Sequence, residues 1–157
     1  MAVGAVESLL NIVKKKIKVF YDQFISLKGE PKSLAKGLAV GIFVGVTPTI
    51  PFHTALIVFI GFFFRHNFTS AYLGSWLISN PVTVPIFYLS QYELGRLILG
   101  MSPVKFTISD YSISTLANMG WQILLPLLAG GIIMAPLFEI PAYFTAHKMI
   151  VSIRKKT

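Results

Sequence analysis

The sequence contains no cysteine and few charged residues, and both shortages narrow the class of protein. Without cysteine, neither a disulfide nor a thiolate metal site can form. Charged residues make up only 13% of the 157 positions, whereas a soluble domain carries about 25%. Hydrophobic residues make up 54%. This composition is typical of a one-domain membrane protein.

Catalytic motifs are also missing. There is no HExxH, GxSxG or P-loop pattern, and the histidines His53, His66 and His147 are scattered. The chain has only 6 acidic residues against 14 lysines and arginines. We therefore expect no enzyme activity, no cofactor and no metal site.

The basic residues that give the chain its net charge of +8 lie beside apolar segments. Most lysines lie near the two ends of the chain, as in proteins that face an anionic membrane surface. We therefore expect membrane lipids as partners, and no nucleic acid. Residues 1–10 lack the positive start of a signal peptide, so insertion is expected to depend on internal segments.

Apolar residues recur at intervals of three and four near the N-terminus, which predicts an amphipathic helix over 5–28 within an N-terminal unit 1–29. Lys14 and Lys16 flank the apolar stripe. This pattern favours a helix lying on an anionic leaflet. The alternative is a helix that packs on the rest of the protein or on another copy. The stripe comprises Val6, Leu9, Leu10, Val13, Ile17, Phe20, Phe24 and Leu27.

Three tracts carry no Asp, Glu, Lys or Arg: 37–64, 66–92 and 111–138. Each is long enough for a membrane span, which needs about 20 residues. The third predicts a transmembrane helix over 121–144, between a loop 101–120 and a basic tail 145–157. Trp121 and Tyr143 would be its interfacial anchors.

Prolines interrupt the first two tracts, within the segments 33–64 and 68–100 of a membrane domain 30–157. Each tract is thereby divided into two half-helices of about 20 Å, shorter than a hydrocarbon core of about 30 Å. The breaks are Thr47-Pro48-x-x-Pro51 and Asn80-Pro81-x-x-x-Pro85.

Backbone carbonyls freed by proline cannot face lipid, so the breaks must be buried in protein or line a wet cavity. Paired broken segments point to a transporter-type site at membrane depth, with helix N-termini aimed at an anion. Thr47, Thr83 and Asn80 would add polar groups there. The alternative is two kinked helices whose threonines bond back to the preceding turn.

Single residues add further hypotheses. Gly37, Gly41 and Gly45 form a small-residue face for helix packing. Arg65 is either a snorkelling cation or a phosphate clamp. Glu93 and Arg96 lie three residues apart and can pair. Glu139, the sole acid of the third segment, is either a proton-coupling group or a partner for Arg65 or Arg96.

The basic N-terminal region and tail place both termini in the cytoplasm. An even number of crossings is then required. The first tract is expected to be a re-entrant hairpin that returns at Arg65, the second a broken helix crossing outward, and 121–144 the return crossing.

The stretches GLAVGIFVGVTPTIPFHT and RHNFTSAYLGSWLISNPVTVPIFYLSQYELG resemble a bacterial membrane family known as domain of unknown function 2062. The resemblance covers about 28–155. It implies no settled activity, but fusion of some relatives to glycosyltransferases implies a link to envelope glycoconjugates. The family pattern falls on Gly41, Gly45, Pro48, Arg65, Asn67, Gly74, Trp76, Asn80, Pro81, Thr83, Pro85, Tyr92 and Gly95.

Together these features predict an all-α integral protein of the bacterial inner membrane. We expect it to bind or translocate an anionic lipid or a polyprenyl-phosphate-like carrier in envelope biogenesis. The alternative is an adaptor that organises an envelope glycosyltransferase. A homo-oligomer or such an enzyme is the expected protein partner. The candidate ligand-binding residues are Thr47, Pro48, Arg65, Asn67, Asn80, Pro81, Thr83, Pro85, Tyr92, Glu93 and Arg96, and the candidate packing residues are Gly37, Gly41, Gly45 and Gly74.

Overall fold

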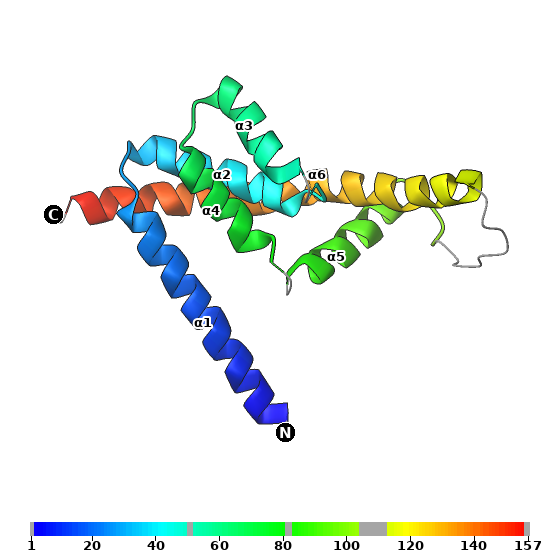
Figure 1. The fold of residues 1–157 in the computed structure, drawn as a ribbon, viewed down its shortest axis with the longest axis horizontal. Coiled ribbons are helices and arrows are strands. Elements are labelled where there is room, and N and C mark those ends of the chain that lie inside the picture. Colours follow the sequence, from blue (N-terminus) through cyan, green and yellow to red (C-terminus); the bar gives the residue numbers. More distant parts are fainter. Residues whose placement is uncertain (1, 50–51, 81–82, 104–112, 156–157) are drawn as a thin grey trace.

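The computed structural model describes residues 2–49, 52–80, 83–103 and 113–155, and within these ranges it contains six helices and no strand (Figure 1). The all-α class predicted from the sequence is therefore confirmed. The helices are α1 (Ala2–Ser26), α2 (Pro31–Val46), α3 (His53–Phe64), α4 (Phe68–Ile78), α5 (Thr83–Ile98) and α6 (Ile113–Arg154).

Local sequence signals explain where the short helices begin and end. Pro31 occupies the first turn of α2, where its missing N–H costs nothing. Thr47 is extended, as the residue before a proline must be, and α2 ends there. Asn67 caps α4, because its side-chain oxygen accepts a hydrogen bond from the Ser70 N–H at 2.8 Å.

Helix α6 differs most from its predicted form. It runs unbroken through Pro126, Pro136 and Pro141 for 42 residues. Residues 113–120 of the expected loop and 145–154 of the expected tail are therefore helical, whereas the limits 121–144 of the membrane span itself stay a prediction. Its apolar pattern continues on both sides of those limits. In the described part of the chain, Gly120–Arg154 is the one stretch long and apolar enough to cross a membrane.

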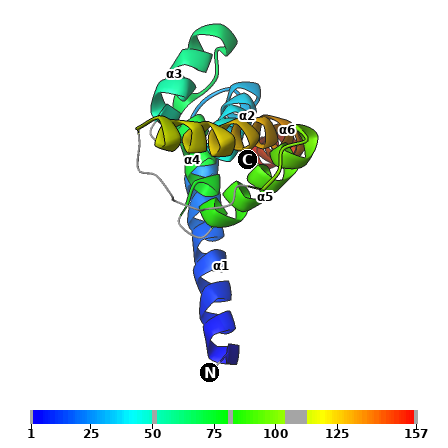
Figure 2. The same cartoon turned by 90° about the vertical axis from the view of Figure 1, so that its right-hand side faces the viewer.

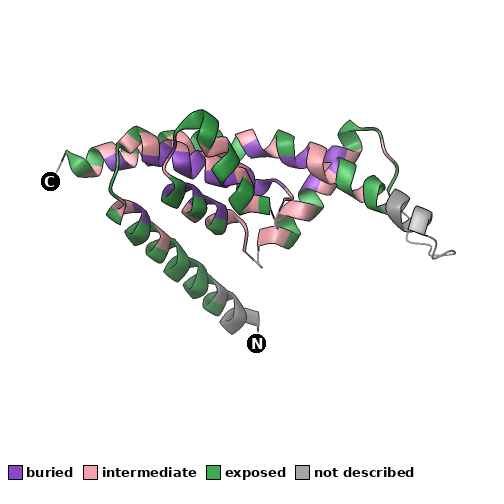
Figure 3. Ribbon diagram, turned by 45° about the horizontal axis from the view of Figure 1, so that its top comes forward, coloured by how far each residue is buried: buried purple, intermediate pink, exposed green. Residues whose placement is uncertain are grey.

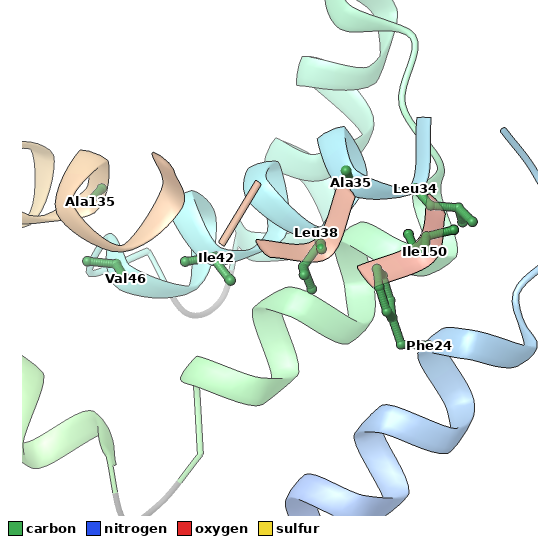
Figure 4. Packing of buried hydrophobic residues seen from close by; sticks show 9 residues of the cluster. Phe24, Leu34, Ala35, Leu38, Ile42, Val46, Ala135 and Ile150 are labelled. Carbon is green, nitrogen blue, oxygen red and sulfur yellow. The ribbon is translucent and has the colours of Figure 1, made fainter. Parts of the chain in front are cut away.

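The helices α2 and α5 lie along successive parts of α6, and α4 packs on α2 (Figures 1 and 2). The core therefore forms along one face of α2 (Figure 4). Leu34, Leu38 and Ile42 of this face are buried together with Ala135 and Ile150 of α6.

Glycines set how closely these helices approach one another. A Cβ atom on Gly41 would collide with the carbonyl group of Ala71 in α4. On the other side of the molecule, a Cβ on Gly95 would collide with the carbonyl of Pro126, and one on Gly130 with that of Gln91. Both the α2–α4 contact and the α5–α6 contact are thus backbone-to-backbone contacts that exclude larger residues.

Helices α1 and α3 contribute little to this core (Figure 3). Phe24, near the end of α1, is fully buried, whereas the helix upstream of it extends away and is exposed. Only Ile57 of α3 is buried, and Phe62 on the same helix is 80% exposed. The apolar surfaces of both helices are therefore free to meet lipid or another protein.

Replacing Gly41 by alanine tests the close α2–α4 contact. Gly41→Ala is expected to lower the free energy of unfolding by about 1–3 kcal/mol, because the added methyl group forces the two backbones apart. Gly120→Ala is the matched control, since nothing lies within 4 Å of its Cβ position. Thermal unfolding in one detergent would measure both. Equal melting temperatures for the two variants would contradict the prediction.

Candidate functional site

The two proline breaks lie against each other in space. The Ser79 hydroxyl at the end of α4 donates to the Gly45 carbonyl near the end of α2 at 3.0 Å. His53, at the start of α3, places Nδ1 3.3 Å from the Ser75 Oγ and 3.5 Å from the Ser79 Oγ. The ends of α2 and α4 and the start of α3 therefore share one polar cluster.

Several polar side chains of the breaks form hydrogen bonds with the backbone of the breaks themselves. The Thr47 hydroxyl donates to the Val44 carbonyl at 2.8 Å, and that of Thr83 donates to the Ile78 carbonyl. The Asn80 side chain accepts from the Thr83 N–H at 3.2 Å and so caps α5. Both threonines therefore bond back to a preceding turn, as the kinked-helix alternative required. Each break nevertheless separates two distinct helices, α2 from α3 and α4 from α5, whereas a kink would bend one continuous helix.

Gln91 supplies the polar group that α2 needs at its end, and sequence reasoning missed it. Its side chain is fully buried, and Nε2 donates to the Val46 carbonyl at 2.6 Å. Its Oε1 is buried without a hydrogen-bond partner among the described residues. The adjacent pair Gly130–Gly131 was the available signal. A Cβ on Gly131 would lie 2.8 Å from Pro48, so the absence of a side chain at Gly131 leaves room for the proline of the first break.

A cleft of about 250 Å³ opens between α1 and the break that joins α4 to α5. Lys16 is the one charged residue among those that line it. Asn80 and Thr83 of the break face the same space, and the remaining lining is apolar. The cleft is lined by Ile12, Val13, Lys16, Ile17, Trp76, Leu77, Asn80 and Thr83. The sequence alone placed Lys16 beside an apolar stripe and gave no sign that it lines a cleft.

The structure does not bring all of the predicted ligand-binding residues together in one place. Arg65 and Asn67 lie in the α3–α4 turn, separated from the breaks by the length of α3, roughly 18 Å for 12 residues. Arg65 is exposed and adopts a left-handed conformation with φ 37°. His66, between them, is buried, and this burial lowers the pKa of its imidazole. Pro81 lies outside the described residues.

The remaining candidates lie along α5. Glu93 and Arg96 form an ion pair at 2.5 Å, and the pair is exposed on the Glu93 side. Pro85, which lies inside the first turn of α5 and not between helices, lines a cavity of about 540 Å³ with Tyr92 and Glu93. Ile123 and Leu127 of α6 form the opposite wall. This cavity is apolar apart from the tyrosines and Glu93.

Glu139 pairs with neither Arg65 nor Arg96. Arg96 is held by Glu93, and Glu139 lines a groove between α2, α3 and α6. In the described part of the chain, no three His, Asp or Glu side chains come together as a metal site would require.

The role of Gln91 in closing the end of α2 can be tested by Gln91→Leu. This change leaves the buried Val46 carbonyl without its donor, and we expect a loss of about 1–3 kcal/mol in unfolding free energy. Ser90→Ala, at an exposed neighbouring position of α5, should change stability by no more than about 0.5 kcal/mol. Chemical denaturation in a single detergent provides the comparison. A Gln91→Leu protein as stable as Ser90→Ala would refute the role.

Comparison with known proteins gives one family match. Neither the curated proteins nor the solved structures contain a match to this chain. Residues 14–157 match a bacterial family, and the match extends from the middle of α1 to the end of the chain. The resemblance to domain of unknown function 2062 is thereby confirmed. The chain belongs to the family described as "Uncharacterized protein conserved in bacteria (DUF2062)".

Proposed function

We propose that the protein is a multi-pass protein of the bacterial inner membrane that binds or translocates an anionic lipid or lipid carrier, such as a polyprenyl phosphate. The cleft between α1 and the α4–α5 break is the observation that carries this proposal. It combines a single cation, two polar side chains and long apolar walls, which is the composition that an amphiphilic anion requires.

Each part of such a lipid has a partner in the cleft. The Lys16 ammonium group supplies the charge for a phosphate, and hydrogen bonds between charged groups are stronger than neutral ones. Ile12, Val13 and Ile17 of α1 line the space beside Lys16 and offer surface to an acyl or prenyl chain. Trp76, which lies across from them, is 47% exposed and adds an amphipathic ring.

The arrangement of helices supports the proposed crossings. The Asn67 N–H, just before α4, donates to the Ser33 carbonyl at the start of α2 at 3.2 Å. Helix α3 therefore returns the chain to the end at which α2 entered, as a re-entrant hairpin would. Arg154 donates to the Gly29 carbonyl at 2.5 Å, so the basic C-terminal end lies beside the basic N-terminal region. The positive-inside rule then favours the cytoplasm for both.

A second candidate function is that of an adaptor for an envelope glycosyltransferase. The exposed aromatic surface of α3 favours it, because Phe59, Phe62 and Phe63 are all at least 60% exposed. Such a patch would be covered either by lipid or by a protein partner, including a second copy of the chain. The adaptor requires no lipid in the cleft, so lipid binding separates the two functions.

The lipid proposal predicts that one lysine of α1 matters more than its neighbour. Lys16→Gln should weaken binding of dioctanoyl phosphatidylglycerol by about 10- to 150-fold, because a contact with a charged group contributes about 1.5–3 kcal/mol. Lys18→Gln removes the same charge from a residue that does not line the cleft. Native mass spectrometry of the full chain in a neutral detergent measures both affinities.

The unaltered protein and Lys18→Gln should retain similar affinity. Equal loss in both lysine variants would indicate a general charge effect and reject the cleft as the site. Absence of specific binding to the unaltered protein would reject the lipid function and favour the adaptor.

A further inference from the structure

Residues of α2, α3 and α6 line a second groove. It consists of two adjoining cavities of about 260 Å³ and 350 Å³. Val40, Phe64 and Glu139 line both cavities, so the two adjoin along these side chains. It shares no lining residue with the cleft beside α1.

The first cavity carries one charge of each sign. Lys36 of α2 and Glu139 of α6 both line it, yet no ion pair joins them among the described residues. Glu139 is half-buried, and its carboxylate makes no ion pair within that part of the chain. A carboxylate withdrawn from water without a partner is costly, so this position favours an incoming cation or hydrogen-bond donor.

Aromatic residues form part of the walls of the first cavity, beside Ala39, Val40 and Ile140. Phe64, Tyr143 and Phe144 surround the space next to Glu139. Aromatic faces attract ammonium groups, and a nearby carboxylate strengthens that preference. Lys36 supplies the positive charge that a phosphate would need. The combination fits a head group that bears both an ammonium and a phosphate.

The second cavity is apolar apart from Glu139. Val40, Phe43 and Ile60 line it together with Phe64. An acyl chain fits such walls, whereas a free polar head group would leave them exposed to water. The ligand is therefore an amphiphile and not a small zwitterion alone.

We propose that this groove binds a zwitterionic phospholipid with a primary ammonium, of the phosphatidylethanolamine type. The ammonium group contacts Glu139, the phosphate contacts Lys36, and an acyl chain follows Phe43 and Ile60. A primary ammonium is preferred to a quaternary one because only the former donates N–H hydrogen bonds to the carboxylate. Glu139 repels a purely anionic head group, so this groove and the α1 cleft select different lipids.

The test uses dioctanoyl phosphatidylethanolamine and the full chain in a neutral detergent, with native mass spectrometry as the readout. Glu139→Gln and Lys36→Gln should each weaken binding about tenfold, the factor that corresponds to about 1.4 kcal/mol. Glu30→Gln and Lys32→Gln are matched controls, because both positions are exposed and line neither cavity. The control variants should bind as the unaltered protein does.

Further lipids and variants make the result decisive. Dioctanoyl phosphatidylcholine should bind more weakly than the ethanolamine lipid, and Glu139→Gln should reduce the difference. Lys16→Gln should leave ethanolamine-lipid binding unchanged, which separates this proposal from that of the α1 cleft. Unchanged affinity in Glu139→Gln, or equal binding of the two lipids by the unaltered protein, would overturn the proposal. Melting temperatures confirm that each variant is folded.

Discussion

The carbonyl groups at the ends of interrupted helices must find donors inside the protein, and the fold is arranged around this requirement. The Gln91 side chain of α5 donates a hydrogen bond to the Val46 carbonyl, and the Ser79 hydroxyl at the end of α4 donates one to the Gly45 carbonyl. A carbonyl left without a donor in a dry environment costs several kcal/mol. These two bonds therefore tie α4 and α5 to the end of α2, although α5 is 45 residues away from Val46 in sequence.

Such bonds can form only where the helix backbones come very close. Gly41 lets α2 meet α4, while Gly95 and Gly130 let α5 meet α6. The glycines cost conformational entropy in a helix interior, and the close contacts offset that cost. Helices α1 and α3 lie outside these close contacts, and both present exposed apolar faces.

The cleft beside α1 and the groove beside α3 combine charge and apolar surface differently. The cleft beside α1 has Lys16 as its one charged lining residue, whereas the groove beside α3 contains both Lys36 and Glu139. The cleft is lined by α1, α4 and the α4–α5 break, and the groove by α2, α3 and α6, so the two are built from different helices.

The spacing of apolar residues and the positions of proline by themselves determined the elements of this protein. The apolar stripe predicts α1, and the prolines at 48 and 81 predict the gaps that follow α2 and α4, because these signals act within one or two turns. Only the tertiary structure decided what meets at the breaks. Gln91 carries no local signature, and Arg65 lies a helix length from the breaks despite its family motif. Lys16 likewise lines the cleft only because of the angle at which α1 extends from the buried Phe24. The reason is physical: hydrogen bonds and charges at a site depend on distances between segments far apart in the chain, and local patterns do not fix those distances.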